Sequence, residues 1–179
     1  MKFTTEAYLD LLNQLRLVAI NSKSIEQRHR MRDNMMRLAV RVFDATSAYL
    51  CKHDFEQQVS IVLNDYISPP KSKIATGFDV GHIYPEGDMP RHTAWLYSDD
   101  PQPYILKPAE LDSDGAEYAE YSPHNVMSVI FAPIHYDASL WGYLEIWDSK
   151  RERTYTETQF ERLNKIASAI SDSILTSDG

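Results

Sequence analysis

The sequence has one cysteine, a minority of basic residues and no long apolar run. Cys51 is the only cysteine among 179 residues, which excludes an intramolecular disulfide, a cysteine-based zinc site and a redox-active cysteine pair. A single free cysteine suits a reducing compartment. Apolar stretches such as 129–134 are far shorter than the roughly 20 residues of a membrane span, and the first ten residues lack the apolar segment of a secretory signal. We therefore expect a soluble cytoplasmic protein with no membrane partner.

Acidic residues outnumber basic ones. The chain has 18 Lys and Arg against 26 Asp and Glu, which gives a net charge of −8. An acidic chain repels phosphate backbones, so we expect no nucleic-acid partner. Hydrophobic residues make up 43% and charged residues 25%, which is typical of a globular chain with a core of ordinary size.

Three segments have the apolar spacing of amphipathic helices. A capping box at Ser24–Gln27 starts the second helix, and one at Thr156–Gln159 starts the third. Their apolar faces fit two arrangements: packing on the sheet of the same chain, or pairing with a second copy in a homodimer through the terminal helices. The spacing leaves both open. The stripes are Tyr8, Leu12, Leu15 and Ala19; Met31, Met35, Leu38 and Val42; and Phe160, Leu163, Ala167, Ile170 and Ile174.

Other segments have the composition of β-strands. The short polar connection 137–139 predicts an antiparallel hairpin between the two strands that flank it. We expect four strands, at 47–53, 58–67, 128–136 and 140–148, and a weaker fifth at 103–107.

Alternation assigns the side chains of two of these strands to opposite faces. In the last strand, Leu144 and Ile146 share the face that we expect to pack on the terminal helices. The opposite face carries Trp141, Tyr143, Glu145 and Trp147. In the second strand, the same rule places Val59, Ile61 and Leu63 on one face and Ser60, Val62 and Asn64 on the other.

Residues 69–127 differ from the rest of the chain. They hold eight of the nine prolines and four of the six glycines, so long regular elements are not expected. They are also too rich in aromatic residues for a solvated linker. We expect ordered loops and short helices that fold over the sheet, where they either cover a binding cavity or complete a second hydrophobic core. The aromatics are Phe78, Tyr84, Trp95, Tyr97, Tyr104, Tyr118 and Tyr121.

The aromatic face of the last strand and this segment together predict a concave site with few polar groups, which is the usual make-up of a small-molecule pocket. We expect the ligand to be an organic molecule that the sequence does not identify. The candidate ligand-binding residues are Trp95, Tyr97, Tyr104, Tyr118, His124, Tyr143, Glu145 and Trp147.

Residues 128–174 carry a family resemblance. A Ser precedes an aliphatic strand that ends in Pro133-Ile134, Gly142 lies inside the next strand, and Tyr155-Thr156 opens the last helix, followed by the L-x-x-I-A-x-x-I pattern of 163–170. This ordered set resembles the end of a GAF domain, and residues 48–66 resemble its first two strands more weakly. A glycine inside a strand also allows another backbone or a ligand to come close.

The resemblance covers about residues 25–176 and implies a GAF/PAS-like α+β fold. That fold has a central antiparallel sheet of about five to six strands, with N- and C-terminal helices packed on one face and a loop and short-helix insert over the other. We expect an accessory helix at 1–23 and the GAF-like domain at 24–177.

GAF domains are regulatory modules that bind small molecules or mediate dimerisation. The members that attach a bilin covalently have a cysteine where this chain reads EYAEYSPHNVMS (117–128), so that attachment is not expected. The cyclic-nucleotide motif keeps Lys150 and a conservative Tyr155, but its Asn and both acids are replaced. The methionine sulfoxide reductases of this fold need several cysteines and are excluded.

We expect no metal, no cofactor and no enzymatic activity. His82, His92 and His124 lie near acids such as Asp79 and Asp88, but their spacing matches no metal-ligand motif. Hydrolase, zinc-protease and phosphate-loop patterns are absent from the sequence. The sequence therefore predicts a small-molecule-sensing regulatory domain that acts on an effector protein in trans. The alternative is a homodimerisation module whose pocket is filled by its own aromatic residues.

Overall fold

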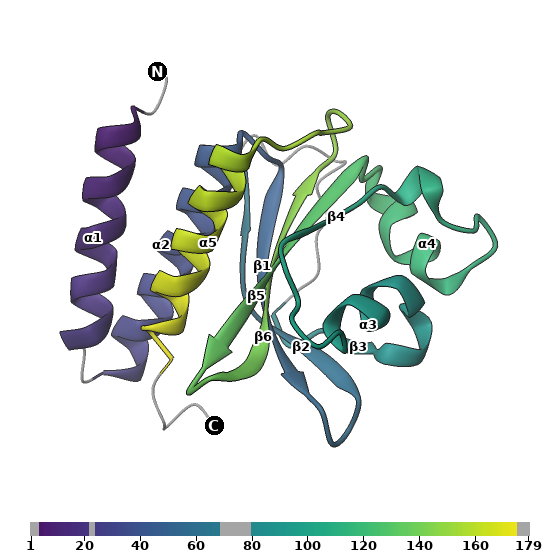
Figure 1. Cartoon of the computed structure of the whole chain (residues 1–179), viewed down its shortest axis with the longest axis horizontal. Helices are drawn as coiled ribbons and strands as arrows, with labels where there is room; N and C mark the ends of the chain where they lie inside the picture. The colour runs from purple at the N-terminus through teal and green to yellow at the C-terminus, as the bar shows by residue number, and fades with distance from the viewer. Residues whose placement is uncertain (1–3, 22–23, 69–79, 175–179) are drawn as a thin grey trace.

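The computed structural model describes residues 4–21, 24–68 and 80–174, and within them the chain is α+β with one curled antiparallel sheet (Figure 1). The six strands lie in the order β3-β2-β1-β6-β5-β4, so the first and the last strand along the chain, β1 and β6, are the two central ones. This confirms the predicted fold class. The strands are β1 (Ser47–Asp54), β2 (Val59–Ile67), β3 (Ile83–Pro85), β4 (Tyr104–Leu106), β5 (Ser128–Tyr136) and β6 (Ser139–Asp148).

Three long helices cover one face of the sheet: α1 (Thr5–Asn21), α2 (Ile25–Phe43) and α5 (Glu157–Ser171). α2 and α5 lie against the strands, and α1 lies outside them (Figure 1). Among the helices described, none combines the length and the apolar character that a membrane span requires. The predicted stripes pack within the chain, where Leu12, Met35, Leu38, Leu163 and Ile170 are buried with Leu50, Leu144 and Ile146 of the sheet.

One of the two predicted capping boxes is present at the start of its helix. The capping box of α5 is confirmed, because the backbone N–H of Gln159 donates to Thr156 Oγ1 over 3.4 Å and Gln159 Oε1 accepts from the backbone N–H of Thr156 over 2.8 Å. Ser24 is the N-cap residue of α2, but its side chain makes no cap hydrogen bond to the helix residues described. The side chain of Ala19, the last member of the first stripe, lies outside the described residues.

Two β-bulges overturn part of the predicted alternation. In β2, Leu50 of β1 pairs with Asn64 and Cys51 pairs with Val62, so Leu63 is the extra residue of a bulge. An extra residue reverses the faces beyond it. Val62 therefore packs on the far side of the sheet from the long helices, whereas Asn64 faces α2 and donates to Asp33 Oδ1 over 2.8 Å.

The second bulge lies in β6. His135 pairs with Leu140 and Ile134 pairs with Gly142, which leaves Trp141 without a partner in the register. Trp141 packs with the helix-side core rather than with the aromatic face, so its predicted side was wrong. The rest of β6 alternates as predicted. Leu144 and Ile146 belong to the helix-side core, and Tyr143 and Trp147 belong to the core on the opposite face.

Candidate functional site

The face of the sheet away from the long helices is covered by residues 80–127, which we call the insert (Figure 1). Phe78 and Asp79, which the sequence also places in this region, lie outside the described residues. Aromatic rings from the sheet and the insert meet there and are almost fully buried. The insert contains η1 (Glu86–Asp88), α3 (Pro90–Leu96), η2 (Pro108–Glu110), α4 (Ala116–Tyr121) and η3 (Ser122–His124).

Glu145 is a buried carboxyl group in the middle of these rings, with 2% of its surface exposed. Trp147 Nε1 donates to its Oε1 over 2.6 Å, and the Tyr121 hydroxyl reaches the same oxygen at 3.4 Å. Burial raises the pKa of Glu145 to about 8, against the opposing effect of these two donors. The side chain is therefore mostly protonated at neutral pH. Its other oxygen, Oε2, receives no hydrogen bond from any residue that the structure describes.

His92 is a second buried polar group on this face. Its ring centroid lies 4.5 Å from that of Tyr143, 4.6 Å from that of Phe131 and 5.5 Å from that of Trp95. Neither ring nitrogen has a hydrogen-bond partner within the described part of the chain. Burial lowers the pKa of His92 to about 3, so the ring is neutral and offers one donor and one acceptor.

α4 fixes the position of His92. The buried carboxylate of Glu117 accepts hydrogen bonds from the backbone N–H groups of Arg91 (3.1 Å) and His92 (2.9 Å) at the start of α3. These N–H groups have no partner inside the helix, so the carboxylate satisfies them. The contact holds the His92 ring against the sheet.

The other end of α3 is tied to β1 through His53. The Tyr97 hydroxyl donates to Glu86 Oε1 over 2.5 Å, the same oxygen contacts His53 Nε2, and His53 Nδ1 lies 2.8 Å from Ser60 Oγ. Burial lowers the pKa of His53, and Glu86 opposes this effect. Ser60, His53 and Glu86 contain the residue types of a catalytic triad, but His53 faces the serine with Nδ1 and the acid with Nε2, the reverse of a triad, and Ser60 is only 2% exposed. The array fastens the insert to the sheet.

The structure brings six of the eight predicted ligand-binding residues to this face. Tyr143, Glu145 and Trp147 are buried on it. Half-buried rings at its border belong to Trp95, which contacts His92; Tyr104, which stacks on Phe131 at 6.0 Å; and His124, whose ring centroid is 5.5 Å from that of Trp147.

The other two predicted residues lie elsewhere. Tyr97 is 45% exposed and takes part in the His53 array at the rim of the insert. Tyr118 lines a separate cavity of about 360 Å³ between α3 and α4. Sequence reasoning did not select His92, Tyr49, Tyr121 or Phe131, which are buried on the same face. Tyr121 could have been selected because it is one of the aromatic residues of the insert. Tyr49 could not, because only its pairing with Glu145 in the sheet places it on this face.

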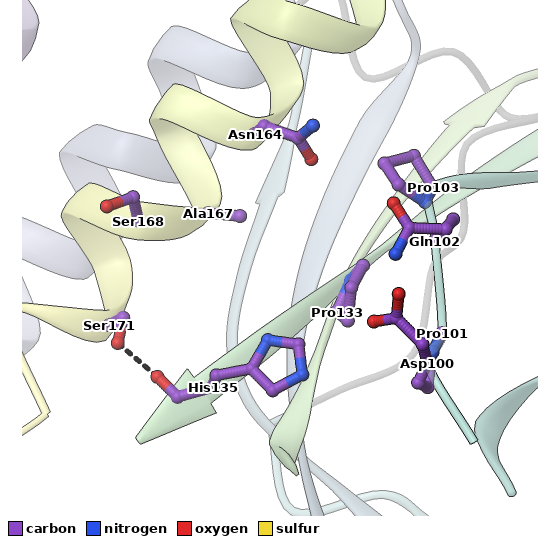
Figure 2. Close-up of a pocket in the computed structure, with 10 residues that line it drawn as sticks. All are labelled: Asp100, Pro101, Gln102, Pro103, Pro133, His135, Asn164, Ala167, Ser168 and Ser171. Atoms are coloured by element: carbon purple, nitrogen blue, oxygen red, sulfur yellow. Dashed lines mark hydrogen bonds between the residues drawn. The ribbon is translucent and has the colours of Figure 1, made fainter. Parts of the chain in front are cut away.

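A further pocket, of about 300 Å³, opens at the outer edge of β5 beside α5 (Figure 2). It contains none of the predicted residues. No group of three His, Cys, Asp or Glu side chains in the described ranges is arranged to hold a metal ion.

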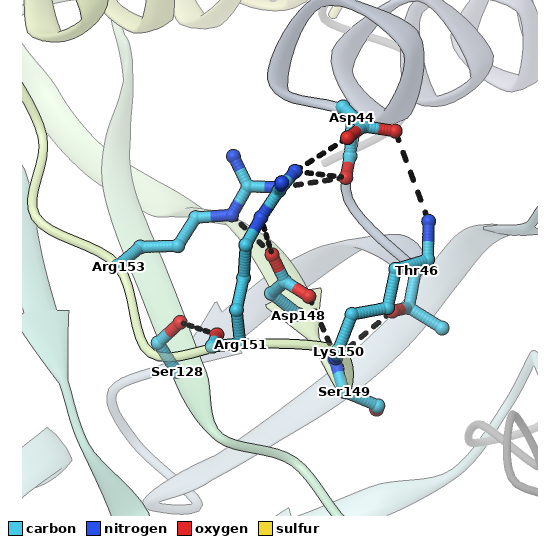
Figure 3. A network of polar contacts seen from close by, with 8 residues as sticks. All are labelled: Asp44, Thr46, Ser128, Asp148, Ser149, Lys150, Arg151 and Arg153. Atoms are coloured by element: carbon cyan, nitrogen blue, oxygen red, sulfur yellow. Dashed lines mark hydrogen bonds and ion pairs between the residues drawn. The ribbon is translucent and has the colours of Figure 1, made fainter.

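The end of the aromatic strand is joined to the end of α2 by an ionic network (Figure 3). The buried carboxylate of Asp148 contacts Nε of Arg153 and lies 3.4 Å from Nε of Arg151. Both guanidinium groups also reach Asp44, the C-cap residue of α2. Lys150, whose acidic partner in the cyclic-nucleotide motif is replaced in this chain, lies 3.7 Å from Asp44. Trp147 is thus one residue from a contact between the sheet and the helix layer.

Comparison with solved structures identifies this architecture. A phycoerythrobilin-bound GAF domain from a cyanobacterial phytochrome superposes with a TM-score of 0.71 at 16% identity, over 97% of both chains. A phycocyanobilin-bound GAF domain from a cyanobacterial phytochrome gives 0.71 at 17% identity, over 93% of this chain and 94% of that one. The chain has the fold of a GAF domain.

Other GAF structures agree with this assignment. The GAF domain of PixJ from Thermosynechococcus elongatus, in its blue-light absorbing form, gives a TM-score of 0.63 at 12% identity, over 84% of this chain and 88% of that one. By sequence, the chain matches no protein-family model and no curated protein significantly. At these identities the likeness establishes the GAF fold alone.

Cys51 lies in β1 of this GAF fold, as the sequence predicts, and is fully buried on the insert side of the sheet. Burial raises the pKa of its thiol well above the ordinary value, so it stays protonated and unreactive.

Proposed function

We propose that the chain is a sensory GAF domain that binds a small organic molecule between the insert and the aromatic face of β6. The observation that carries this proposal is His92, a buried ring whose two nitrogens have no hydrogen-bond partner among the described residues, together with the nearby buried carboxyl group of Glu145, whose printed hydrogen bonds use Oε1 alone. Such groups are rare in folded proteins because leaving one unpaired costs about 1–3 kcal/mol. A ligand that pairs with them recovers that cost. Bilins bound to the similar GAF structures support a ligand on this fold.

The lining defines what the ligand must offer. Protonated Glu145 can donate through Oε2, and neutral His92 supplies one donor and one acceptor. The surrounding rings of Trp95, Tyr143 and Trp147 favour a flat apolar body. The matching ligand is a planar, largely apolar molecule without a strong negative charge that carries hydrogen-bonding atoms at its edge.

Binding would act on the rest of the molecule through two routes. Glu117 and the His53 array hold the two ends of α3 against the sheet. A ligand that enters beneath α3 would therefore loosen these contacts. A displaced Trp147 would move Asp148, and through it the contact with Asp44 at the end of α2. We propose that an effector protein in trans reads this change at the helix layer. The coupling needs the ligand to favour one of the two packings.

Native mass spectrometry of the purified protein tests the proposal first, because a co-purified compound appears as added mass that is lost on denaturation. The neutral dimethyl ester of phycocyanobilin and adenine are then titrated separately, with cyclic GMP as the anionic control and with thermal unfolding and absorbance as readouts. We expect a non-covalent ligand or a thermal shift that Glu145→Leu and His92→Phe abolish, whereas Glu145→Gln, whose side-chain amide can still donate, should retain it. Glu161→Gln, at an exposed position of α5, serves as the matched control. Absence of bound mass and of any shift, in a folded protein, would reject sensing by this site.

A homodimerisation module is the second candidate, and one observation favours it. Leu17, Val18, Ile20 and Ile25 are 49–61% exposed around the junction of α1 and α2. Exposed apolar groups of this kind are common at protein interfaces. Light scattering after size exclusion decides the matter: a dimer that Leu17→Asp dissociates supports this candidate, and a monomer at high concentration rejects it.

A further inference from the structure

The pocket at the outer edge of β5 has a structural origin of its own. β4 pairs only with Val129–Phe131, so the second half of β5 has no paired strand on its outer side among the described residues. Residues 100–103 pass this edge instead, and two of them are prolines. Proline has no N–H to donate, so this segment cannot extend the ladder with a full set of hydrogen bonds. α5 forms the opposite wall, and a space of about 300 Å³ remains between them (Figure 2).

The walls of this pocket are held by hydrogen bonds. Trp95 Nε1 donates to the carbonyl oxygen of Gln102 over 2.7 Å, which anchors the connecting segment to α3. The Ser171 hydroxyl donates to the carbonyl oxygen of His135, which joins the end of α5 to β5. Pro101 is buried beside them. Because both walls are anchored, the shape of the pocket is largely formed before any ligand arrives.

Besides two serines of α5, the polar side chains around the space come from three segments: Asp100, Gln102, His135 and Asn164 (Figure 2). All four residues are exposed, and no hydrogen bond or ion pair of their side chains with a described residue is present. The lining includes a carboxylate, two amides, an imidazole and the hydroxyl groups of Ser168 and Ser171, but no lysine or arginine. The local charge is therefore negative, in a chain whose net charge is −8. Such a lining attracts a cation that also carries hydrogen-bonding groups.

We propose that this pocket binds a small polyhydroxylated amine, of the amino-sugar type, with its ammonium group on Asp100 and its hydroxyl groups on Gln102, His135 and Asn164. The volume equals that of about ten water molecules and lies at the lower end of ligand pockets, which suits one sugar ring. No residue of the aromatic site lines this pocket. Trp95 contacts it only from outside, through its hydrogen bond to Gln102. The ligand would contact α5 directly at Ala167 and Ser168, on the helix that follows β6.

Glucosamine is the probe, and glucose and gluconate are the uncharged and anionic controls. Each is titrated into ¹⁵N-labelled full-length protein up to about 10 mM, which detects dissociation constants in the millimolar range. The side-chain amide signals of Gln102 and Asn164 report on the pocket itself. We expect saturable shifts confined to the pocket, largest with glucosamine. Asp100→Asn should weaken glucosamine about fivefold and leave glucose unchanged, as for one exposed charge pair.

Two variants separate binding at the pocket from general effects. Asp99→Asn removes the adjacent exposed carboxylate, which does not line the pocket, and should bind like the wild type. Asn164→Phe fills the space from an exposed helix position and should abolish the shifts in a protein that still gives a folded spectrum. Shifts that persist in Asn164→Phe, equal affinity for all three probes, or no saturable shift in the wild type would each overturn the proposal. None of these outcomes bears on the aromatic site, whose test uses different ligands.

Discussion

Trp147 and Glu145 form a hydrogen bond within a single strand, with the indole Nε1 donating to Oε1 over 2.6 Å. Residues two apart in a strand share a face, so the indole and the carboxyl group enter the same buried layer together. Tyr121 adds a second donor from the insert at 3.4 Å. These bonds favour the ionised carboxylate, yet burial outweighs them and raises the pKa to about 8. The carboxyl group therefore carries a free-energy cost that depends on pH.

Glu145→Gln should make the free energy of unfolding depend less on pH between pH 4.5 and 8. Because the folded pKa lies above the ordinary value of 4.5, the unfolded chain binds fewer protons between pH 4.5 and 8, and stability falls as the pH rises. Between pH 6.5 and 8 the free energy of unfolding should fall by about 2 kcal/mol through this one group. Glutamine keeps an acceptor for Trp147 and Tyr121 without titrating. Unfolding curves across this range check the prediction, and a variant with the wild-type slope would contradict it. Glu161→Gln should retain that slope.

His92→Phe should stabilise the protein and should reduce the loss of stability that occurs as the pH falls below 6.5. The folded pKa of about 3 lies below the ordinary value of 6.5, so stability is present above pH 6.5 and is lost as the pH falls through this range. Phenylalanine fills a similar space without the two unpaired nitrogens, which should add about 1 kcal/mol of stability. Chemical denaturation at pH 7 and pH 5 measures both effects. A strongly destabilised variant would mean that the ring nitrogens have partners after all. Exposed His29→Phe should show no gain.

Much of the fold is readable from the sequence because its signals are local. Apolar spacing and a capping box define α5, and alternation over residues 143–147 places Glu145 and Trp147 on the correct face. The errors in the predicted strand faces fall at Asn64, which follows the bulge at Leu63, and at Trp141, the extra residue of the second bulge. A bulge depends on how two strands pair, and neither strand alone encodes it.

The candidate site is less predictable because it depends on contacts between distant segments. His92 faces the sheet since Glu117, 25 residues away, holds the start of α3. Tyr49 lies beside Glu145 only through the β1–β6 register. Tyr97 was chosen as a lining residue for its ring, yet its hydroxyl places it at the rim with Glu86. Composition reveals that an aromatic site exists, whereas the register and helix orientation decide which residues form it.

Gly142→Ala should prevent the sheet from closing. A Cβ at this position would lie 2.1 Å from the carbonyl oxygen of Cys51 and 3.0 Å from Cα of Lys52, both of them backbone atoms of the neighbouring strand. Backbone of a central strand cannot move aside cheaply, so we expect a loss above about 4 kcal/mol or no folded protein. Gly87→Ala is the matched control because a Cβ there meets no atom within 4 Å. Circular dichroism and thermal unfolding of both variants check the contrast, and equal stability of the two would refute it.

Asp148→Asn should be far more damaging than Asp44→Asn, although both residues contact the same two arginines (Figure 3). The Asp44 carboxylate contacts Arg151, whereas Arg153 donates to the backbone carbonyl oxygen of Asp44, which the substitution keeps. The Asp148 side chain is 0% exposed and that of Arg153 is 10% exposed, whereas Asp44 is 71% exposed. Removing the charge of Asp148 leaves the Arg153 guanidinium half-buried without its anion, which costs about 3 kcal/mol. The exposed pairs of Asp44 are screened by water, so their loss costs less than about 1 kcal/mol. Urea denaturation of both variants measures the difference. Equal losses would mean that the burial of Asp148 contributes nothing to the strength of its ion pair.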